Sequence, residues 1–195
     1  NLLDGGTSVG SSITIADADG FVVNDGGTMK TIPATDIPTY VGSGLSTASQ
    51  WRVTTNFTDD ADPIASNWEV SDTTGYGSLG SAMSESSGVF TFPSTGYWLV
   101  MFNHDAYSTS AQLWGAAQLL VTTDNSTYGS IATASTSFYS SSSFSSSVAV
   151  AIVDVTSTSN VKVSFKVDVA HADVTTVGNT DIHRTGATFV RLGDT

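Results

Sequence analysis

The sequence of 195 residues contains no cysteine and few charged residues. Without cysteine the chain has neither disulfides nor thiolate metal ligands, so its stability must come from packing or from association between copies. Only 12% of the residues are charged, against roughly 25% in ordinary soluble domains. Solubility therefore depends largely on hydroxyl and amide groups, which the abundant serine and threonine residues supply.

Basic residues are scarcer still. Six lysines and arginines stand against 18 acidic residues, which gives a formal net charge of −12. Phosphate recognition needs clustered Lys and Arg side chains, so this balance argues against nucleic acid as a partner and against an anionic membrane surface. Neutral glycans, cationic protein patches and divalent cations remain compatible with the charge.

Long apolar runs are also absent. The longest, Tyr97–Phe102, has the length of a strand and falls far short of the ~20 residues that a membrane span requires, so we expect no membrane insertion. The first six residues, Asn1–Gly6, lack the basic and apolar regions of a signal peptide. We expect these residues to be a cut end of a longer protein.

The usual signatures of catalysis are missing from the sequence. His104, His171 and His183 are the only imidazoles, and none lies in an HExxH arrangement. The Gly-x-Ser-x-Gly motif is absent, and Glu69 and Glu85 are the only glutamates. Catalytic groups must lie within hydrogen-bonding reach of one another, and no pattern here brings them together. We expect a protein that is not an enzyme.

The first 44 residues differ in character from the rest and predict a small connector. Two short strands are expected at residues 12–16 and 20–24, where apolar residues alternate. The Asp-Gly-Gly at residues 25–27 is a strong turn signal. Pro38 limits any helix that follows to about one turn. The connector is thus expected to be a hairpin with a short helix.

Residues 45–195 predict an all-β head. Apolar and polar residues alternate in short runs, and Gly, Pro, Asn, Asp and Ser separate the runs, as in an antiparallel β-sandwich or a closed barrel. The predicted strands are Trp51–Thr55, Trp68–Val70, Gly88–Phe92, Tyr97–Asn103, Gln112–Thr123, Ile131–Phe138, Val148–Val155, Val161–Val169 and Ala187–Leu192.

One strand is typical of a sheet with one wet face. In Val161–Val169 the valines and Phe165 alternate with polar residues, and alternate side chains of a strand point to opposite faces. We therefore expect Phe165 and the valines in the core, and Lys162, Ser164, Lys166 and Asp168 in water.

Three other strands are apolar on both faces: Tyr97–Phe102, Val148–Val153 and, nearly so, Ala187–Leu192. A sheet built from them would expose a larger apolar patch than soluble monomers tolerate, and another copy of the chain is the simplest cover. The alternative is that the connector or a loop covers the sheet. The first interpretation predicts a homotrimer whose interface and inner sheet contain Tyr97, Trp98, Leu99, Met101, Phe102, Val150, Ile152 and Phe189.

Two segments of the head resemble a known family. Residues 88–100, Gly-Val-Phe-Thr-Phe-Pro-Ser-Thr-Gly-Tyr-Trp-Leu-Val, resemble the G-x-F-x-F-P-x-x-G-x-Y/W strand pair of C1q/TNF-like jelly-roll domains. Residues 185–192 are similar to the final strand of that family. The resemblance covers roughly residues 46–195 and implies a jelly-roll fold. It also implies that the doubly apolar strands form the inner sheet, around which three copies meet.

The connector resembles a second group of proteins. Residues 17–32 and 34–37 are similar to short connecting segments of bacteriophage fibre and virion proteins, where they precede a distal knob. The resemblance implies a trimeric head on a phage fibre, spike or decoration protein, attached to other virion proteins through residues 1–44 and located at the virion surface or outside the cell. Such heads bind a host glycan or protein, or another virion part. The alternative is a secreted, calcium-dependent carbohydrate-binding β-sandwich module.

The only metal site that the sequence suggests is a cluster of carboxylates. Asp59, Asp60 and Asp62 lie close together, and oxygen-rich loops suit calcium. The cluster matches neither an EF-hand nor a calcium-binding nonapeptide, and a solvated turn would have the same sequence. Calcium is therefore the one possible cofactor, and no other is expected.

Aromatic residues in turn-rich segments are candidate ligand contacts. Tyr107, Trp114 and Tyr139 are such residues, and a ring face covers the apolar face of a sugar. Trp114 shares a predicted strand face with Gln112, Ala116 and Gln118, so packing within a trimer interface is the competing interpretation.

Overall fold

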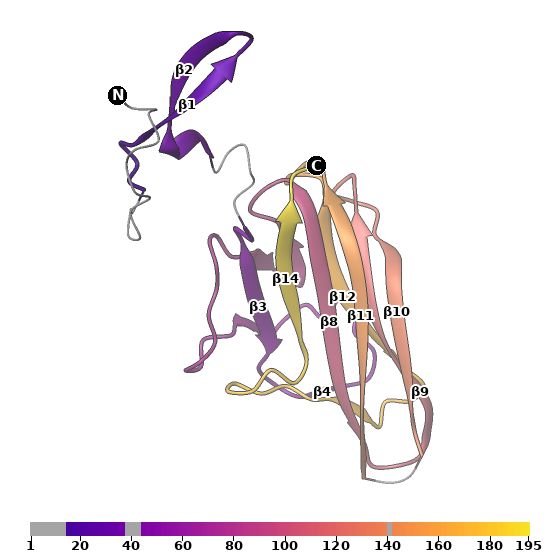
Figure 1. The fold of residues 1–195 in the computed structure, drawn as a ribbon. Coiled ribbons are helices and arrows are strands. Elements are labelled where there is room, and N and C mark those ends of the chain that lie inside the picture. The colour runs from indigo at the N-terminus through magenta and orange to yellow at the C-terminus, as the bar shows by residue number, and fades with distance from the viewer. Residues whose placement is uncertain (1–14, 38–43, 140–141) are drawn as a thin grey trace. The chain divides into compact units, whose positions relative to one another are not determined.

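The structure of the chain is a computed structural model that describes residues 15–37, 44–139 and 142–195. The chain separates into two compact units, Asn1–Gly44 and Leu45–Thr195. These units correspond to the connector and the head, and each is described by itself (Figure 1). No helix in the described ranges is both long and apolar enough to cross a bilayer.

The connector contains an antiparallel hairpin of β1 (Gly20–Asp25) and β2 (Thr28–Pro33). Gly26 and Gly27 form its turn with φ angles of 60° and 93°, a conformation that glycine adopts without steric cost. A single 3₁₀ turn, η1 (Ala34–Asp36), follows directly. The predicted strand 20–24, its turn and the short helix are confirmed.

The other predicted strand of the connector, residues 12–16, lies mostly outside the described residues. Ile15 and Ala16, at its end, are not in a strand. The strand that pairs with β1 is β2, which follows β1 in the sequence after the Gly26–Gly27 turn. Its sequence, Thr-Met-Lys-Thr-Ile-Pro, has too weak an apolar alternation to have been recognised.

The head consists of two antiparallel sheets that pack face to face (Figure 1). The large sheet has the order β4-β13-β8-β14-β3-β5, and β11 pairs with β8 along its whole length. Its strands are β3 (Ala48–Val53), β4 (Phe57–Thr58), β5 (Trp68–Val70), β8 (Gly96–Ser108), β11 (Ser143–Val155), β13 (Val174–Thr176) and β14 (Gly186–Gly193).

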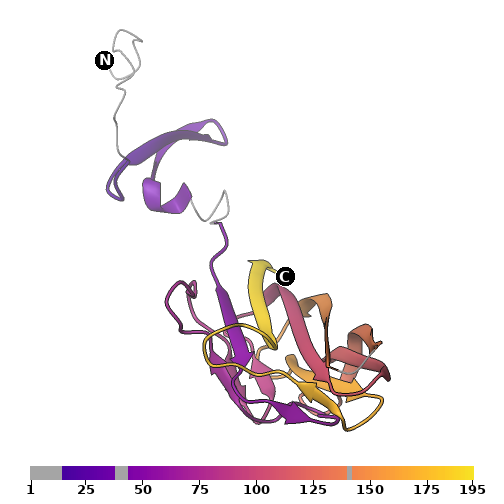
Figure 2. The ribbon, with the colours of Figure 1, turned by 90° about the horizontal axis from the view of Figure 1, so that it is seen from below.

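The small sheet has the order β10-β9-β12-β7-β6. Its strands are β6 (Ser84–Ser86), β7 (Val89–Thr91), β9 (Gln112–Thr122), β10 (Gly129–Phe138) and β12 (Lys162–Val169). Figure 2 shows the head from below, from the end at which β8 and β10 finish and β9 and β11 begin. Each of the nine strands predicted for the head coincides with one of these strands. Only β4, β6 and β13, with two or three residues each, gave no sequence signal.

Aromatic rings fill the space between the two sheets. Phe102 of β8 stacks on Phe165 of β12 at 4.7 Å between ring centroids. Phe90 and Phe189 lie against the same group, at 5.3 Å from each other, and Phe165, Phe90, Phe102 and Phe189 are completely buried. Trp98 contacts Phe92 at the other end of this core. Such ring pairs add specific geometry to the hydrophobic stabilisation of the sandwich.

The prediction for residues 161–169 is confirmed with one exception. Phe165 and the four valines of the segment are buried, whereas Lys162, Lys166 and Asp168 are partly exposed. Ser164, which we expected in water, is buried. It lies opposite Leu120 on one side and Val89 on the other, and these larger neighbours shield its short side chain.

Candidate functional site

The outer face of the large sheet, the side away from the aromatic core, is apolar over its central strands. Side chains of β8 and β11 alternate, so that Trp98, Val100 and Phe102 are buried in the core while Leu99 and Met101 are half-buried on the other side. We call the outward residues the apolar face; its members are Leu99, Met101, Val148, Val150, Ile152 and Val190.

The strand register joins these residues into one continuous patch. Leu99 lies opposite Ile152 on one side and Val190 on the other, and Met101 lies opposite Val150. Val150 is 49% exposed and Ile152 is 63% exposed. Among the described residues of the head, therefore, no loop covers this patch. Contiguous apolar surface on a β-sheet usually marks an interface.

The eight residues predicted for the interface and inner sheet divide into two groups. Tyr97, Leu99, Met101, Val150 and Ile152 lie on the outer side of the large sheet. Trp98, Phe102 and Phe189 belong to the same sheet but are completely buried inside one protomer, so they cannot contact another copy. A strand that is apolar on both faces does not reveal in its sequence which face meets the core.

The patch becomes polar toward the lower end of β8. Asp105 accepts hydrogen bonds from the Arg184 guanidinium and, at 3.3 Å, from the Ser146 hydroxyl. The Asn103 amide donates to the Arg184 carbonyl oxygen. These charges are thus paired within one protomer, and an assembly over the apolar face would not leave Asp105 without a partner.

His104 lies inside the sandwich, directly after the segment Tyr97–Asn103 that the sequence predicts as a strand. The strand β8 continues to Ser108 and carries His104 into the interior, where its Nε2 lies 3.0 Å from the Thr176 hydroxyl. Burial lowers the pKa of His104 from 6.5 to about 4, against the opposing effect of the negative charge of Asp105. His104 is therefore neutral at physiological pH and is a structural residue.

This histidine predicts a loss of stability in mild acid. Below pH 6.5 the unfolded chain binds a proton at His104 that the folded chain does not bind until about pH 4. The free energy of unfolding should therefore fall over this window, by about 3 kcal/mol at its lower end. Urea unfolding at pH 7.5 and 4.5 measures the difference. His104→Gln should reduce the difference, and an unchanged difference in this variant would contradict the assignment.

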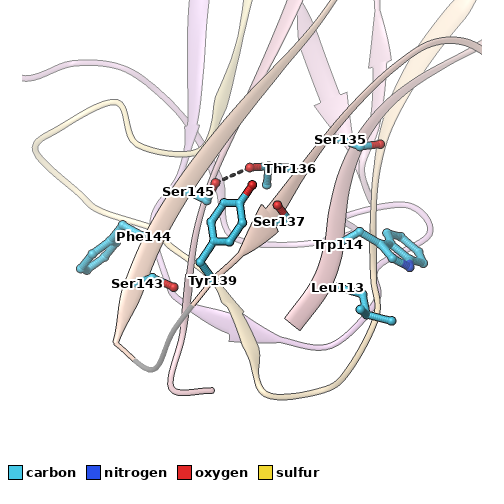
Figure 3. Close-up of a pocket in the computed structure, with 9 residues that line it drawn as sticks. All are labelled: Leu113, Trp114, Ser135, Thr136, Ser137, Tyr139, Ser143, Phe144 and Ser145. Atoms are coloured by element: carbon cyan, nitrogen blue, oxygen red, sulfur yellow. Dashed lines mark hydrogen bonds between the residues drawn. The ribbon is translucent and has the colours of Figure 1, made fainter. Parts of the chain in front are cut away.

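A hollow of about 630 Å³ opens where β9 begins, β10 ends and β11 begins (Figure 3). We call it the aromatic hollow; its lining residues are Leu113, Trp114, Ser135, Thr136, Ser137, Tyr139, Ser143, Phe144 and Ser145. Figure 3 shows Leu113 and Trp114 on one side, Phe144 on the other and Tyr139 between them. The Thr136 and Ser145 hydroxyls form a hydrogen bond that links the small sheet to the large sheet.

The large side chains of the hollow are unusually open to solvent. Leu113 is 84% exposed and Tyr139 is 91% exposed, while Phe144 is 62% and Trp114 is 38% exposed. Of the three predicted ligand contacts, the structure brings Trp114 and Tyr139 together here. Tyr107 is not among the lining residues, and its ring packs against that of Phe144 at 4.9 Å.

Sequence reasoning missed Leu113, Phe144 and the hydroxyls of this site. Phe144 is the one apolar residue in a serine-rich stretch. This isolation is the sequence feature that could have marked it as a candidate ligand contact. The serine-rich stretch itself becomes the start of β11, because its backbone pairs with β8 from Ser143↔Ser108 onward.

The three carboxylates proposed for calcium have other contacts. Asp60 accepts a hydrogen bond of 2.7 Å from the Val169 backbone N–H, and Asp62 lies 3.1 Å from the Lys166 ammonium. Asp59 accepts a hydrogen bond from the backbone N–H of Asp60. Across residues 15–37, 44–139 and 142–195, no three His, Asp or Glu side chains converge to hold a metal ion. The carboxylates of Asp60 and Asp62 thus attach the loop to β12, while that of Asp59 contacts only the loop itself.

We expect calcium to have no effect on the stability of the head. A cation at this loop would have to displace Lys166 from Asp62 and the backbone N–H of Val169 from Asp60. Thermal unfolding in EDTA and in millimolar calcium chloride should give the same Tm, because only a ligand that binds the folded state raises it. A higher Tm in calcium that Asp60→Asn abolishes would show that the loop binds the ion.

Comparison with known proteins identifies the fold. No protein-family model matches the chain, and no curated protein matches its sequence. Among solved structures, murine APRIL at pH 5.0 is similar with a TM-score of 0.56 and 12% identity, over 75% of this chain and 98% of that one. Eiger TNF from S. frugiperda has a TM-score of 0.58 and 13% identity, over 76% of this chain and 93% of that one.

These similarities confirm the fold predicted from the sequence. The head is an antiparallel jelly roll of the TNF-like type, and at identities this low the similarity concerns the fold alone. Function has to be argued from the surfaces of this chain.

Proposed function

We propose that the head is a trimeric, surface-displayed module of a bacteriophage fibre, spike or decoration protein, which binds a host receptor or another virion component and catalyses no reaction. The observation that carries the proposal is the apolar face. An uncovered patch that includes Val148, Val150 and Ile152, each about half exposed or more, favours a permanent assembly over a free protomer.

Burial of the patch favours association. Complete burial of a Val or Ile side chain contributes about 1.5–3 kcal/mol, so the exposed part of each residue contributes on the order of 1 kcal/mol. Several such residues on every protomer therefore work against the cost of lost rotational and translational freedom. The ion pair of Asp105 and Arg184 removes one electrostatic penalty of the assembly.

A threefold assembly is favoured over other symmetries by the position of the patch. It lies on β11, β8 and β14 of the large sheet, which correspond to the inner sheet of the C1q/TNF-like jelly rolls that the sequence resembles. Closed rings bury such a surface without leaving an open end. We therefore propose that three large sheets meet along one axis.

Display outside the cell on a virion is supported by the sequence. The connector resembles segments that precede the knobs of phage fibres, and the chain needs no disulfide because assembly supplies stability. A head without catalytic signatures, whose remaining conspicuous surface is an open hollow, is suited to recognition.

Sedimentation velocity of the purified chain tests the assembly. A particle of about 60 kDa, three times the 20.2 kDa of one chain, is expected at micromolar concentration, and a stable single subunit would refute the trimer. Virion display has its own test. Antibodies raised against the purified head should label intact phage particles that contain this chain, and particles that bind the antibody only after disruption would contradict it.

A further inference from the structure

The aromatic hollow lies at the end of the sandwich that is farthest from the ends of the head's chain. At one end, β14 pairs with β3 through Val190↔Ala48 and with β8 through Gly193↔Tyr97, so the chain enters and leaves the head there. The hollow is built at the opposite end, where Ser143 of β11 pairs with Ser108 of β8. Within the head, the hollow therefore opens at the end opposite to Ala48 and Gly193 (Figures 1 and 3).

The lining of the hollow combines two kinds of surface. Trp114, Tyr139, Phe144 and Leu113 supply broad apolar faces, and serine and threonine residues from β10 and β11 supply hydroxyls between them. None of the lining residues is charged among those that the structure describes. A ligand that matches this lining must have flat apolar faces, many hydroxyl groups and no charge.

We propose that the aromatic hollow binds a neutral saccharide. The C–H face of a pyranose ring packs on an aromatic ring, and its equatorial hydroxyls exchange hydrogen bonds with serine and threonine hydroxyls. The volume of about 630 Å³ accommodates one to a few sugar units, since ligand pockets of this kind span about 300–1,000 Å³.

Charge and polarity argue against other ligands. An anionic sugar or a phosphorylated headgroup would approach a chain of net charge −12 and find no Lys or Arg among the lining residues. Insertion into the hydrocarbon of a bilayer would carry the hydroxyls of Ser135, Thr136 and Ser137 away from water, at a cost for each one without a partner.

This inference deepens the proposed function, since it names the ligand class of the head, and it rests on that function for its biological setting. The nine lining residues that the structure describes are those of a single protomer, so binding can be measured with and without assembly. The experiment therefore uses both the assembled protein and a monomeric variant, Ile152→Asp.

The probes are the methyl glycosides of glucose, galactose, mannose and N-acetylglucosamine, each titrated to about 50 mM, with Kd values near 1–10 mM expected for one sugar unit. The indole N–H resonances of the four tryptophans provide the readout. Trp98 is fully buried and Trp51 and Trp68 pack against Phe90, so only the Trp114 signal, identified by its loss in Trp114→Ala, should shift.

Three variants locate the site. Trp114→Ala and Tyr139→Ala should each weaken binding about tenfold, the equivalent of losing one ring contact. Tyr128→Ala removes a partly exposed ring outside the hollow and should leave the affinity unchanged. For Trp114→Ala the readout is saturation transfer to the sugar.

The inference is overturned if none of the four glycosides binds, or if binding survives both ring deletions. It is also overturned if sialyllactose binds more tightly than the neutral sugars, or if the protein instead floats with phosphatidylcholine vesicles in a Trp114-dependent way. Sugar binding by a chain that sediments as a monomer would support the hollow and refute the trimer. A trimer without sugar binding would do the reverse.

Discussion

Replacing Ile152 with aspartate is expected to convert the assembly into folded single subunits. Ile152 lies on β11 at one end of the apolar face, opposite Leu99, and is 63% exposed in the protomer, so the fold itself tolerates a polar residue there. In the assembly the same position would place a carboxylate in apolar surroundings, once from each copy, and the copies would repel one another. Sedimentation velocity at micromolar concentration should show a 20.2 kDa species with an unchanged β-sheet circular dichroism spectrum.

A pair of leucines provides the matched control for this result. Leu99 and Leu120 are both half-buried on the outer face of a sheet, but Leu99 belongs to β8 of the large sheet and Leu120 to β9 of the small sheet. We expect Leu99→Asp to dissociate the assembly and Leu120→Asp to leave it intact. Dissociation by both substitutions, or by Leu120→Asp alone, would show that the assembly uses a different face.

The second large effect concerns the interior. Phe102→Ala should destabilise the protomer by about 3–5 kcal/mol, because it removes a buried ring and leaves a cavity between the sheets. Phe102 is completely buried and stacks on Phe165 at 4.7 Å. Urea unfolding measures the change, and it is best carried out in the Ile152→Asp background, where dissociation does not contribute to the free energy of unfolding.

Phe144→Ala is the matched control, because it removes the same side chain from a site that is 62% exposed. It should change the free energy of unfolding by less than about 1 kcal/mol. Equal losses for the two variants would mean that the ring of Phe144 is covered in solution. An intact stability for Phe102→Ala would contradict the position of Phe102 in the core.

The alternation of apolar and polar residues was enough to predict the sandwich. The predicted parts of the longer strands have that alternation or are apolar throughout, because the two faces of a strand differ in environment or are both dry. The polar end of β8, residues 104–108, and the serine-rich start of β11, residues 143–147, show neither pattern, and the predicted strands did not include them. Strands β4, β6 and β13 have two or three residues, and so few positions cannot display a period. Their pairing depends on neighbours that are distant in sequence, such as Thr175↔Tyr107.

The site was only partly accessible from sequence for a related reason. Trp114 and Tyr139 could be recognised as aromatic residues near turns, but their convergence with Phe144 follows from the meeting of β9, β10 and β11 at one end of the fold. Likewise, the inward direction of Trp98 and the outward direction of Leu99 depend on which sheet packs behind β8. Tertiary packing, and not the local sequence pattern, determines which face of the strand meets the core and which residues converge at the hollow.

The long strand β11 has a consequence for how such a head can change over time. Its first residues, Phe144 and Ser145, border the hollow, and its later residues, Val150 and Ile152, form the apolar face. The serine-rich part is held in place by main-chain pairing with β8, which most amino acids permit. Under the proposed function, specificity can therefore change at one end of the strand while the proposed self-association surface at the other end stays constant.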